Sequence, residues 1–371
     1  MIRPTVARVD LEAIRSNFRA ISGFLASGGA APRIIAVVKA NAYGHGAAEV
    51  GPALEEAGAA MLACADIEEG IVLRRAGVRI PILVFGALGI SDLDGVFQHY
   101  LTPTISTPSA ARALQASAAK HGAILKCHLK IDTGMNRLGF RHDNVARTLP
   151  DVAASPNLSI DAVYTHFATA DEPESPAFHE QRERFDAVCL TLESLGIATR
   201  TRHAANSAAL LRDERVWYDC VRPGLLLYGI VPPPLAATLP LRPALSLHSR
   251  IVHVKGLRPG EGTGYGLNTV VDRPSTIAVV PAGYADGLDR RLAGRGYMLV
   301  RGRRAPIVGS VCMDMTMIDV TGTDVAPGDA VVIVGEQGGA SLDVREIAAS
   351  IGTIPYELLC RVGSRIERVY S

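Results

Sequence analysis

The chain has 371 residues, of which 48% are apolar and 20% are charged, as is ordinary for globular proteins of one or two domains. Its 38 lysine and arginine residues nearly balance its 37 aspartate and glutamate residues, so the composition provides no basic face for nucleic acid or an anionic membrane. The N-terminal MIRPTVARVD has no apolar signal core, and no stretch approaches the roughly 18 apolar residues of a membrane span. We therefore expect a cytoplasmic protein with a small-molecule partner.

The six cysteines are scattered without CxxC pairs, and the ten histidines contain no HExxH motif. This usage favours reduced thiols over a disulfide framework or a zinc site, and we expect no metal.

Short apolar runs alternate with helical stretches over about 230 residues, the size of a closed (β/α)8 barrel of the TIM type. Strands are predicted at 34–38, 60–65, 81–85, 101–105, 124–131, 158–166, 200–204 and 225–230. Helices are predicted at 47–57, 66–76, 107–121 and 177–195, among others. An open, doubly wound sheet of eight strands has the same pattern and remains the alternative, although we favour the barrel.

The sequence pattern changes after Tyr228, where long helical stretches largely disappear and three prolines at 232–234 interrupt regular secondary structure. We predict a barrel domain of residues 1–240 and a mostly antiparallel β domain of residues 241–371, with residues 1–9 as candidates to pair with the β domain. Its strands are predicted at 245–257, 276–282, 297–300, 305–311, 315–321 and 330–334. The segment GEGTGYG at 260–266 fits no phosphate-loop pattern and is interpreted as a loop that presents Tyr265.

Lys39 stands directly after the buried strand in IIAVVKANAYGHG, residues 34–46. An isolated lysine at a strand end often extends its stem along the apolar surface and leaves its ammonium in water. At the rim of an apolar core, however, a lysine loses hydration, its pKa falls, and the neutral amine can attack an aldehyde to form a Schiff base.

Other polar residues also follow predicted strands, and the C-terminal ends of barrel strands are where active sites gather. They are Tyr43, Lys130, Asp132, Arg137, His166, His203, Asn206 and Ser207, with Arg222 just before the predicted eighth strand. Each residue alone has an ordinary structural explanation as a cap, a core-edge group or a surface charge. Together they predict a site at one rim of the barrel.

The sequence resembles the alanine racemase family, fold-type III enzymes that depend on pyridoxal phosphate, over essentially its whole length. The matching segments are AVVKANAYGHG (36–46), KIDTGMNRLGF (130–140), AANSAA (204–209), RPGLLLYG (222–229), GTGYG (262–266), PAGYADG (281–287), VGSVCMDM (308–315) and PYELLCRVGSRI (355–366).

The resemblance implies roles for residues around the cofactor. Lys39 matches the lysine that holds pyridoxal phosphate covalently. The remaining cofactor residues implied by the resemblance and the strand-end pattern are Tyr43, His166, His203, Asn206, Ser207, Arg222, Gly224, Leu225 and Tyr356.

Racemisation requires one base on each face of the substrate, because a single base cannot easily reach both. By resemblance these bases are Lys39 and Tyr265. A phenol has a reference pKa of about 10, so Tyr265 needs neighbours that favour phenolate, and His166 and Arg222 match the family residues that supply them. Arg222 also matches the partner of the pyridine nitrogen, where arginine can donate a hydrogen bond but cannot accept the proton.

The resemblance further implies a head-to-tail homodimer with shared active sites. Substrate contacts match Arg137, Tyr284, Cys312, Met313 and Asp314, and the last four, with Tyr265, lie in the predicted β domain. Lys130 matches a position that is carbamylated in some members. Ser310 departs from the arginine that many members carry, beside matching access-corridor residues Asp171, Arg290 and Ile354.

Three alternatives remain at the level of sequence. A broad-specificity racemase is the nearest, and the absence of a secretion signal disfavours it. A decarboxylase with this domain plan would contact the pyridine nitrogen through a carboxylate, which Arg222 argues against. A non-enzymatic cofactor carrier would lack the second domain. The sequence leaves open whether D-alanine is made for peptidoglycan or degraded, and whether serine is a substrate.

Overall fold

The computed structural model describes residues 3–29, 31–88, 92–235 and 238–371. It separates into two compact units. The barrel unit comprises Ala13–Ala42 and Ala47–Arg242, and the β unit comprises the chain up to Glu12, Tyr43–Gly46 and Pro243–Ser371. Along the described residues, no helix combines the length and apolarity needed to cross a bilayer.

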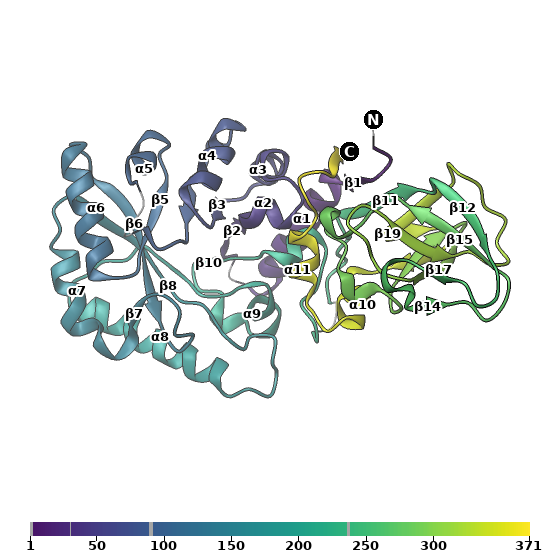
Figure 1. Cartoon of the computed structure of the whole chain (residues 1–371). Coiled ribbons are helices and arrows are strands. Elements are labelled where there is room, and N and C mark those ends of the chain that lie inside the picture. The colour runs from purple at the N-terminus through teal and green to yellow at the C-terminus, as the bar shows by residue number, and fades with distance from the viewer. Residues whose placement is uncertain (1–2, 30, 89–91, 236–237) are drawn as a thin grey trace. The chain divides into compact units, whose positions relative to one another are not determined.

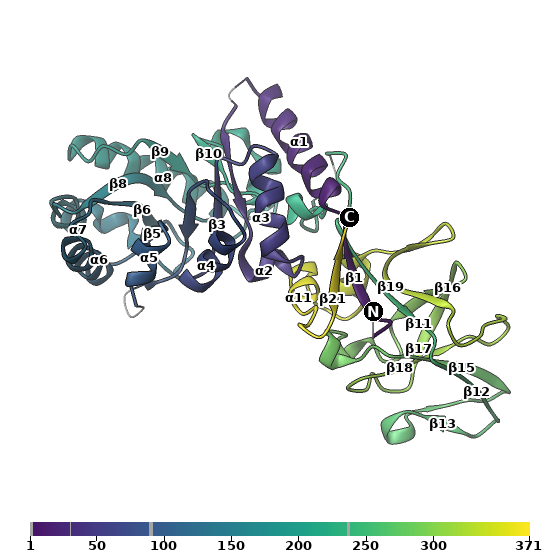
Figure 2. The same cartoon turned by 90° about the horizontal axis from the view of Figure 1, so that it is seen from above.

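Eight parallel strands form a closed barrel, which confirms the predicted fold class (Figures 1 and 2). The order around the sheet is β5-β4-β3-β2-β10-β9-β8-β6, and pairing of β5 with β6 closes the ring. The strands are β2 (Arg33–Val37), β3 (Met61–Cys64), β4 (Ile82–Val84), β5 (Thr102–Ile105), β6 (Leu125–Asp132), β8 (Leu158–Tyr164), β9 (Thr201–His203) and β10 (Cys220–Val221). A short strand, β7 (Phe140–Arg141), pairs beside β6.

Helices lie outside the strands of the barrel (Figure 2). They are α1 (Leu11–Ser27), α3 (Ala47–Glu56), α4 (Ile67–Arg75), α5 (Asp94–Gln98), α6 (Pro108–Lys120), α7 (Val145–Ala153), α8 (Ala177–Ser194) and α9 (Ser207–Arg212). Their ends follow local sequence signals: α6 begins with Thr107, whose hydroxyl accepts from the Ala110 amide, followed by Pro108 at the first helical position. The four helices predicted from sequence are confirmed as α3, α4, α6 and α8.

The predicted strand at 225–230 is wrong, because Leu225–Tyr228 forms the 3-10 turn η4 and the eighth strand is the two-residue β10. All four residues of η4 are buried, and a short, wholly buried apolar run does not distinguish a strand from a helical turn. The correction places Arg222 directly after the eighth strand, at the same end as the other polar residues.

The β unit is built mainly from antiparallel strands (Figure 1). The long sheet has the order β12-β15-β18-β17-β16-β19-β11-β1-β21, in which β1 pairs antiparallel with β11 and parallel with β21. Its strands are β1 (Val6–Val9), β11 (Leu245–Arg250), β12 (His253–Leu257), β15 (Ser275–Val280), β16 (Tyr297–Val300), β17 (Arg303–Val308), β18 (Thr316–Asp319), β19 (Ala330–Gln337) and β21 (Glu367–Tyr370). Further elements are the hairpin β13 (Gly262–Thr263) with β14 (Thr269–Val270), β20 (Ala340–Leu342), and helices α10 (Val344–Ser350) and α11 (Pro355–Cys360).

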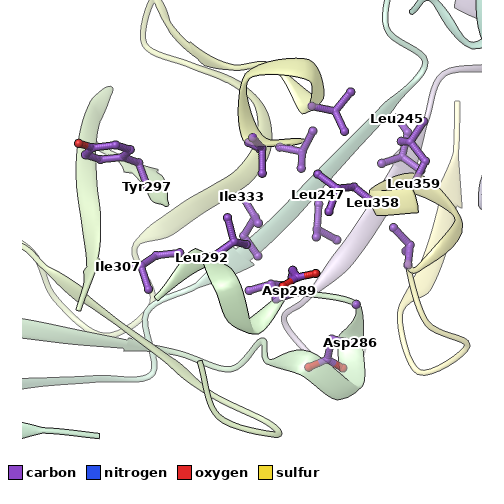
Figure 3. Close-up of a pocket in the computed structure, with 16 residues that line it drawn as sticks. Leu245, Leu247, Asp286, Asp289, Leu292, Tyr297, Ile307, Ile333, Leu358 and Leu359 are labelled. Atoms are coloured by element: carbon purple, nitrogen blue, oxygen red, sulfur yellow. The ribbon is translucent and has the colours of Figure 1, made fainter. Parts of the chain in front are cut away.

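A cavity of about 50 Å³ lies in the core of the β unit (Figure 3). Its lining is largely aliphatic, including Leu247, Ile307 and Ile333. Two carboxylates also line it, but arginines hold both: Arg3 and Arg365 bond Asp286, and Arg291 and Arg361 bond Asp289. We interpret the cavity as a packing gap, since no uncommitted carboxylate is left to orient a ligand.

Candidate active site

Lys39 begins a left-handed turn at the end of β2. The three residues after it, Ala40, Asn41 and Ala42, all have φ near 53° and ψ near 50°, and Tyr43 also has positive φ. Left-handed helical conformation destabilises an L-residue by about 1–2 kcal/mol, so four successive non-glycine residues require support from their surroundings. Such strain is common at functional sites, so the turn after Lys39 is a candidate part of the active site.

The support comes from the barrel unit itself. The Glu69 carboxylate, on α4, accepts from the Ala40 amide at 2.6 Å and from the Ala65 amide at 2.7 Å. The Asn41 side chain accepts from the Ala47 amide at 2.8 Å. These bonds fix the turn from both sides, and therefore fix the backbone from which the Lys39 side chain extends.

Arg222, 3% exposed, is the hub of the polar groups inside the barrel mouth. Its Nη1 donates to His203 Nδ1 at 2.9 Å. Its Nη2 lies within hydrogen-bond distance of the carbonyl oxygens of Thr165 and Ala204 and of His166 Nδ1. Every one of these acceptors is neutral, and among the described residues the Nε–H of Arg222 has no acceptor. Burial lowers the pKa of Arg222 to about 10, so the guanidinium is charged near neutral pH.

The surroundings of His166 show that the predicted lysine and arginine residues lie close enough to affect one another. Its pKa lies well below the ordinary value, first because of burial and then because of Arg222, Lys130, Lys39 and Arg137. His166 is therefore neutral near pH 7. Since Arg222 can only donate, His166 Nδ1 accepts and its ring proton is on Nε2.

Four residues near this cluster were missed by sequence reasoning: His128, Tyr164, Thr104 and Ser106. His128 Nδ1 lies 3.0 Å from His203 Nε2, and the Tyr164 ring stacks on His203 with centroids 4.7 Å apart. The Tyr164 and Thr104 hydroxyls are 2.9 Å apart. The sequence carried a signal for His128, because it stands two residues before Lys130 on a buried strand and so faces the same way.

Lys130 is 8% exposed, and its ammonium lies 4.9 Å from the centre of the Tyr164 ring. Burial, followed by the charges of Arg222 and Arg137, lowers its pKa well below the ordinary lysine value. The hydroxyl of Ser106, the fourth missed residue, is buried with no hydrogen-bond partner among the described residues. Ser106 follows Ile105, which pairs with Leu129, so the strand register sets Ser106 beside Lys130.

We expect Lys130→Met to raise the unfolding temperature of the apoprotein in buffer depleted of carbon dioxide. The unfolded chain binds a proton on Lys130 that the folded state disfavours, so the penalty exists below the unfolded pKa and disappears as pH rises toward it. The gain should be larger at about pH 6 than at about pH 9, as measured by calorimetry. An increase in unfolding temperature that is independent of pH, or a decrease at the lower pH, would show that burial does not disfavour the charged form of Lys130.

Arg137 lies on a tight loop after β6. The Asp132 carboxylate accepts from the amides of Gly134 and Asn136, both at 3.0 Å, and Gly139 has φ of 122°. A Cβ at Gly139 would come within 2.7 Å of the Asp132 amide nitrogen, so the loop can close this tightly only with glycine there. Asp132 thus stabilises the conformation of the loop, and Arg137 is an exposed charged residue on it.

The loops after β9 and β10 are tied by Ser207. Its hydroxyl oxygen accepts from the Gly224 amide at 2.9 Å and lies 3.4 Å from the Leu226 amide. Asn206 caps α9 through a bond from the Ala209 amide. Leu225 opens the turn η4, where the first N–H has no partner within the turn. The Ser207 hydroxyl proton and the Leu225 N–H are therefore suited to bind an anionic group.

The β unit carries the other predicted residues. Tyr43 packs near Tyr356, with ring centroids 5.9 Å apart, and burial raises the pKa of Tyr43 above its ordinary value. Tyr265 is 77% exposed and Met313 is 52% exposed, although large apolar side chains usually avoid water. A hollow of about 660 Å³ contains Tyr284 and Arg290 in its lining.

Backbone contacts fix the segment that carries Met313. The Tyr284 amide donates to the Cys312 carbonyl at 2.9 Å, and the Ala285 amide donates to the Met313 carbonyl at 3.1 Å. A Cβ at Gly283 would lie 2.3 Å from the Cys312 oxygen, so only glycine allows this approach. Arg365 bridges Asp314, at 2.7 Å, to the buried Asp286.

Ser310, the departure from the family pattern, donates to the carbonyl oxygen of Tyr265 at 2.9 Å. The neighbouring Gly264 has φ of 75°, and a Cβ there would lie 2.8 Å from the Ser310 amide nitrogen. The loop that presents Tyr265 is therefore held against the segment around Ser310.

The predicted residues thus fall into two sets. The barrel unit brings together Lys39, Lys130, Arg137, His166, His203, Asn206, Ser207, Arg222, Gly224 and Leu225. The β unit carries Tyr43, Tyr265, Tyr284, Cys312, Met313, Asp314 and Tyr356. Asp171 is on the barrel unit, whereas Arg290 and Ile354 are on the β unit, and their corridor stays a prediction.

Comparison with known proteins bears on the whole chain. The family model for the alanine racemase N-terminal domain matches residues 9–232, and the model for the alanine racemase C-terminal domain matches residues 244–370. The chain is 42% identical over 370 residues to the alanine racemase of Halothermothrix orenii, covering 99% of this chain and 97% of that protein.

Solved structures that resemble this chain are also alanine racemases. The alanine racemase from a D-cycloserine-producing Streptomyces lavendulae is 34% identical, with a TM-score of 0.94 over 100% of this chain and 98% of that one. The alanine racemase of Bartonella henselae, described with covalently bound pyridoxal phosphate, is 28% identical, with a TM-score of 0.88 over 99% of each chain. From these matches and the barrel and β units described above, we conclude that this chain belongs to the alanine racemase family, whose members are pyridoxal-phosphate-dependent isomerases.

Proposed function

We propose that this chain interconverts L-alanine and D-alanine with pyridoxal phosphate bound to Lys39. The observation that carries the proposal is the buried cluster beside Lys39, in which the groups that accept from Arg222 are all neutral and its Nε–H has no acceptor among the described residues. A buried cation surrounded by neutral acceptors is suited to a ligand that brings acceptor atoms and negative charge.

The residues of the barrel unit fit the chemistry of this cofactor. A lysine at a barrel mouth suits an aldehyde, and the Arg222 Nε–H suits an acceptor such as a pyridine nitrogen. The Ser207 hydroxyl and the Leu225 N–H suit a phosphate, together with Tyr43 and Tyr356 by family resemblance. His203 and Asn206 act through the groups they hold, since His203 bonds Arg222 and Asn206 caps α9.

Bound pyridoxal phosphate supplies an electron sink that acidifies the α-proton of an amino acid. The protein must then supply two proton carriers on opposite faces and hold the substrate between them. Lys39 serves one face and Tyr265 of the partner subunit the other. His166, whose Nε2 carries the ring proton, is suited to donate to the oxygen of that tyrosine.

Arg222 limits side reactions by its chemistry. Arg222 would donate to the pyridine nitrogen and could not take up its proton, so it would leave the ring less electron-withdrawing than a protonated ring. The lifetime of negative charge at Cα is shortened, and return of a proton to Cα is favoured.

Substrate binding is assigned to Arg137 and to the Met313 amide of the partner subunit, which are suited to the substrate carboxylate. Tyr284, Cys312 and Asp314 lie around that amide in the same unit. We propose that Lys130 is carbamylated, because its lowered pKa favours the neutral amine that reacts with carbon dioxide. The unpartnered Ser106 hydroxyl is suited to donate to the resulting carbamate.

We further propose a head-to-tail homodimer with shared sites in the cytoplasm. The exposed Tyr265 and Met313 support a partner that covers them, and the cysteines, which form no disulfide in the described structure, suit a reducing compartment. D-alanine would serve peptidoglycan synthesis or be degraded. A requirement of a deletion strain for added D-alanine would favour the biosynthetic role.

Chiral chromatography of the purified protein loaded with pyridoxal phosphate tests the proposal. Incubation with L-alanine or D-alanine should give the same equimolar mixture, with much slower turnover of L-serine. Comparable rates for many amino acids would favour a broad-specificity racemase, and release of carbon dioxide would favour a decarboxylase.

We expect Ser310→Ala to lower kcat for alanine by about two- to tenfold, the effect of one neutral hydrogen bond, while the unfolding temperature stays nearly constant. The loss follows from greater freedom of the Tyr265 backbone, whose carbonyl Ser310 holds. Ser341→Ala, at an exposed strand position, is the matched control. If both variants turn over at the wild-type rate, Ser310 does not position Tyr265.

A further inference from the structure

A chain of hydrogen bonds runs from Arg222 into the interior of the barrel. Arg222 Nη1 lies 2.9 Å from His203 Nδ1, and His203 Nε2 lies 3.0 Å from His128 Nδ1. The three residues are buried, with 3%, 0% and 3% exposure. Because they come from three strands or strand ends, the chain spans the barrel interior rather than one local turn.

The chemistry of the groups sets the direction of every bond in this chain. A guanidinium has no acceptor, so His203 Nδ1 must accept from Arg222. A neutral imidazole has one N–H, so the His203 proton is on Nε2 and donates to His128 Nδ1. Both histidines are neutral, since burial and Arg222 lower the pKa of His128 to about 3 and that of His203 well below its ordinary value.

Other contacts restrict the His203 ring. The Tyr164 ring stacks on it at an interplanar angle of 8°, and Thr104 bonds the Tyr164 hydroxyl. The stacking fixes the plane of the imidazole, but it does not choose between the two tautomers. Arg222 and His128 both favour one of them: Nδ1 accepts from Arg222, and only the Nε2–H tautomer can donate to His128 Nδ1.

We propose that His128 is a positioning residue for the cofactor site: by accepting from His203 Nε2, it keeps His203 Nδ1 available to Arg222 and so fixes the guanidinium with its Nε–H left for the ligand. The inference rests on the proposed role of Arg222 at the pyridine nitrogen. Loss of the His128 acceptor would leave the His203 Nε2–H buried and unpaired. A switch to the other tautomer would then turn an N–H toward Arg222 Nη1, opposing two donors.

Two substitutions separate the acceptor from the bulk of the side chain. In His128→Asn, the amide oxygen stands near the position of Nδ1 and can still accept. In His128→Leu, similar volume remains but the acceptor is gone. Thr5→Val is the control for the loss of a buried hydrogen bond outside the chain, because the Thr5 hydroxyl lies 2.8 Å from the Ser249 hydroxyl in the β unit.

The direct measurement is the protonation of His203 in the full-length, cofactor-loaded protein, read from nitrogen-15 shifts and proton–nitrogen couplings of its imidazole. The wild type and His128→Asn should carry the proton on Nε2, whereas His128→Leu should lose that single state. A His203 proton on Nδ1 in the wild type would overturn the proposal without any variant.

The effect on cofactor binding is measured as the dissociation rate of pyridoxal phosphate after dilution. Arg222→Gln gives the rate expected when the contribution of Arg222 is lost completely. His128→Leu should accelerate release by about tenfold to a hundredfold, as for loss of a buried hydrogen bond to a charged group. His128→Asn and Thr5→Val should stay within about threefold of the wild type. Equal effects of the Asn and Leu variants would show a bulk role and reject the proposal.

The roles of His128 and Arg222 predict different outcomes. If Arg222→Gln releases the cofactor quickly but His128→Leu behaves as wild type, the positioning role is wrong and the role of Arg222 stands. If His128→Leu changes the His203 tautomer but neither variant changes cofactor release, then Arg222 is not the partner of the pyridine nitrogen.

Discussion

Lys39→Ala should abolish covalent attachment of pyridoxal phosphate and reduce racemisation of alanine by at least about a thousandfold, because it removes the proposed attachment point and one of the two proposed bases. Borohydride reduction of the loaded wild-type protein, followed by peptide mapping, should find the pyridoxyl label on Lys39. The same treatment of Lys39→Ala should give no labelled lysine.

Lys126→Ala is the matched control, because Lys126 is an exposed lysine on β6. It should be labelled and active like the wild type. A label on Lys130 or Lys255, or reducible attachment in Lys39→Ala, would contradict the assignment of Lys39.

Activity should reappear when inactive Lys39→Ala and Tyr265→Ala proteins exchange subunits. Lys39 lies in the barrel unit and Tyr265 is on an exposed loop of the β unit, and the proposed shared site would take one of these residues from each chain. A mixed dimer then has one intact site and one doubly altered site. If half of the dimers are mixed, the mixture should recover about a quarter of wild-type activity.

Native mass spectrometry of differently tagged subunits should establish that exchange has occurred. Mixing each variant with inactive protein of its own type is the control and should restore nothing. Exchange without recovery would contradict the shared site, because a site within one chain leaves neither subunit of the mixed dimer intact.

The barrel could be predicted from sequence because its strands are short apolar runs that alternate with longer periodic helices. Prediction failed at 225–230, where a fully buried turn has the same composition as a buried strand. It also missed that Ala40, Asn41 and Ala42 form a left-handed turn. Alanine has no intrinsic preference for that conformation, and the Glu69 carboxylate that stabilises it is distant in sequence.

The site residues at strand ends were accessible to sequence reasoning because parallel strands bring their C-terminal ends to one rim. Residues inside the barrel were harder, since His128 and Tyr164 look like ordinary members of buried strands. Their alternation with apolar neighbours was the available signal. Ser310 was recognised as a departure, but its bond to Tyr265 depends on the close approach of two loops, which no local pattern encodes.

Exchange of the α-proton in deuterium oxide tests the central claim most directly. With the loaded wild-type protein, proton NMR should show loss of the alanine α-proton signal from either enantiomer, and the product enantiomer should carry deuterium at Cα. Lys39→Ala should show neither change, while pyruvate, ammonia and carbon dioxide stay absent throughout. Conversion of one enantiomer into the other without deuterium at Cα, or consumption of alanine with release of carbon dioxide, would contradict the account.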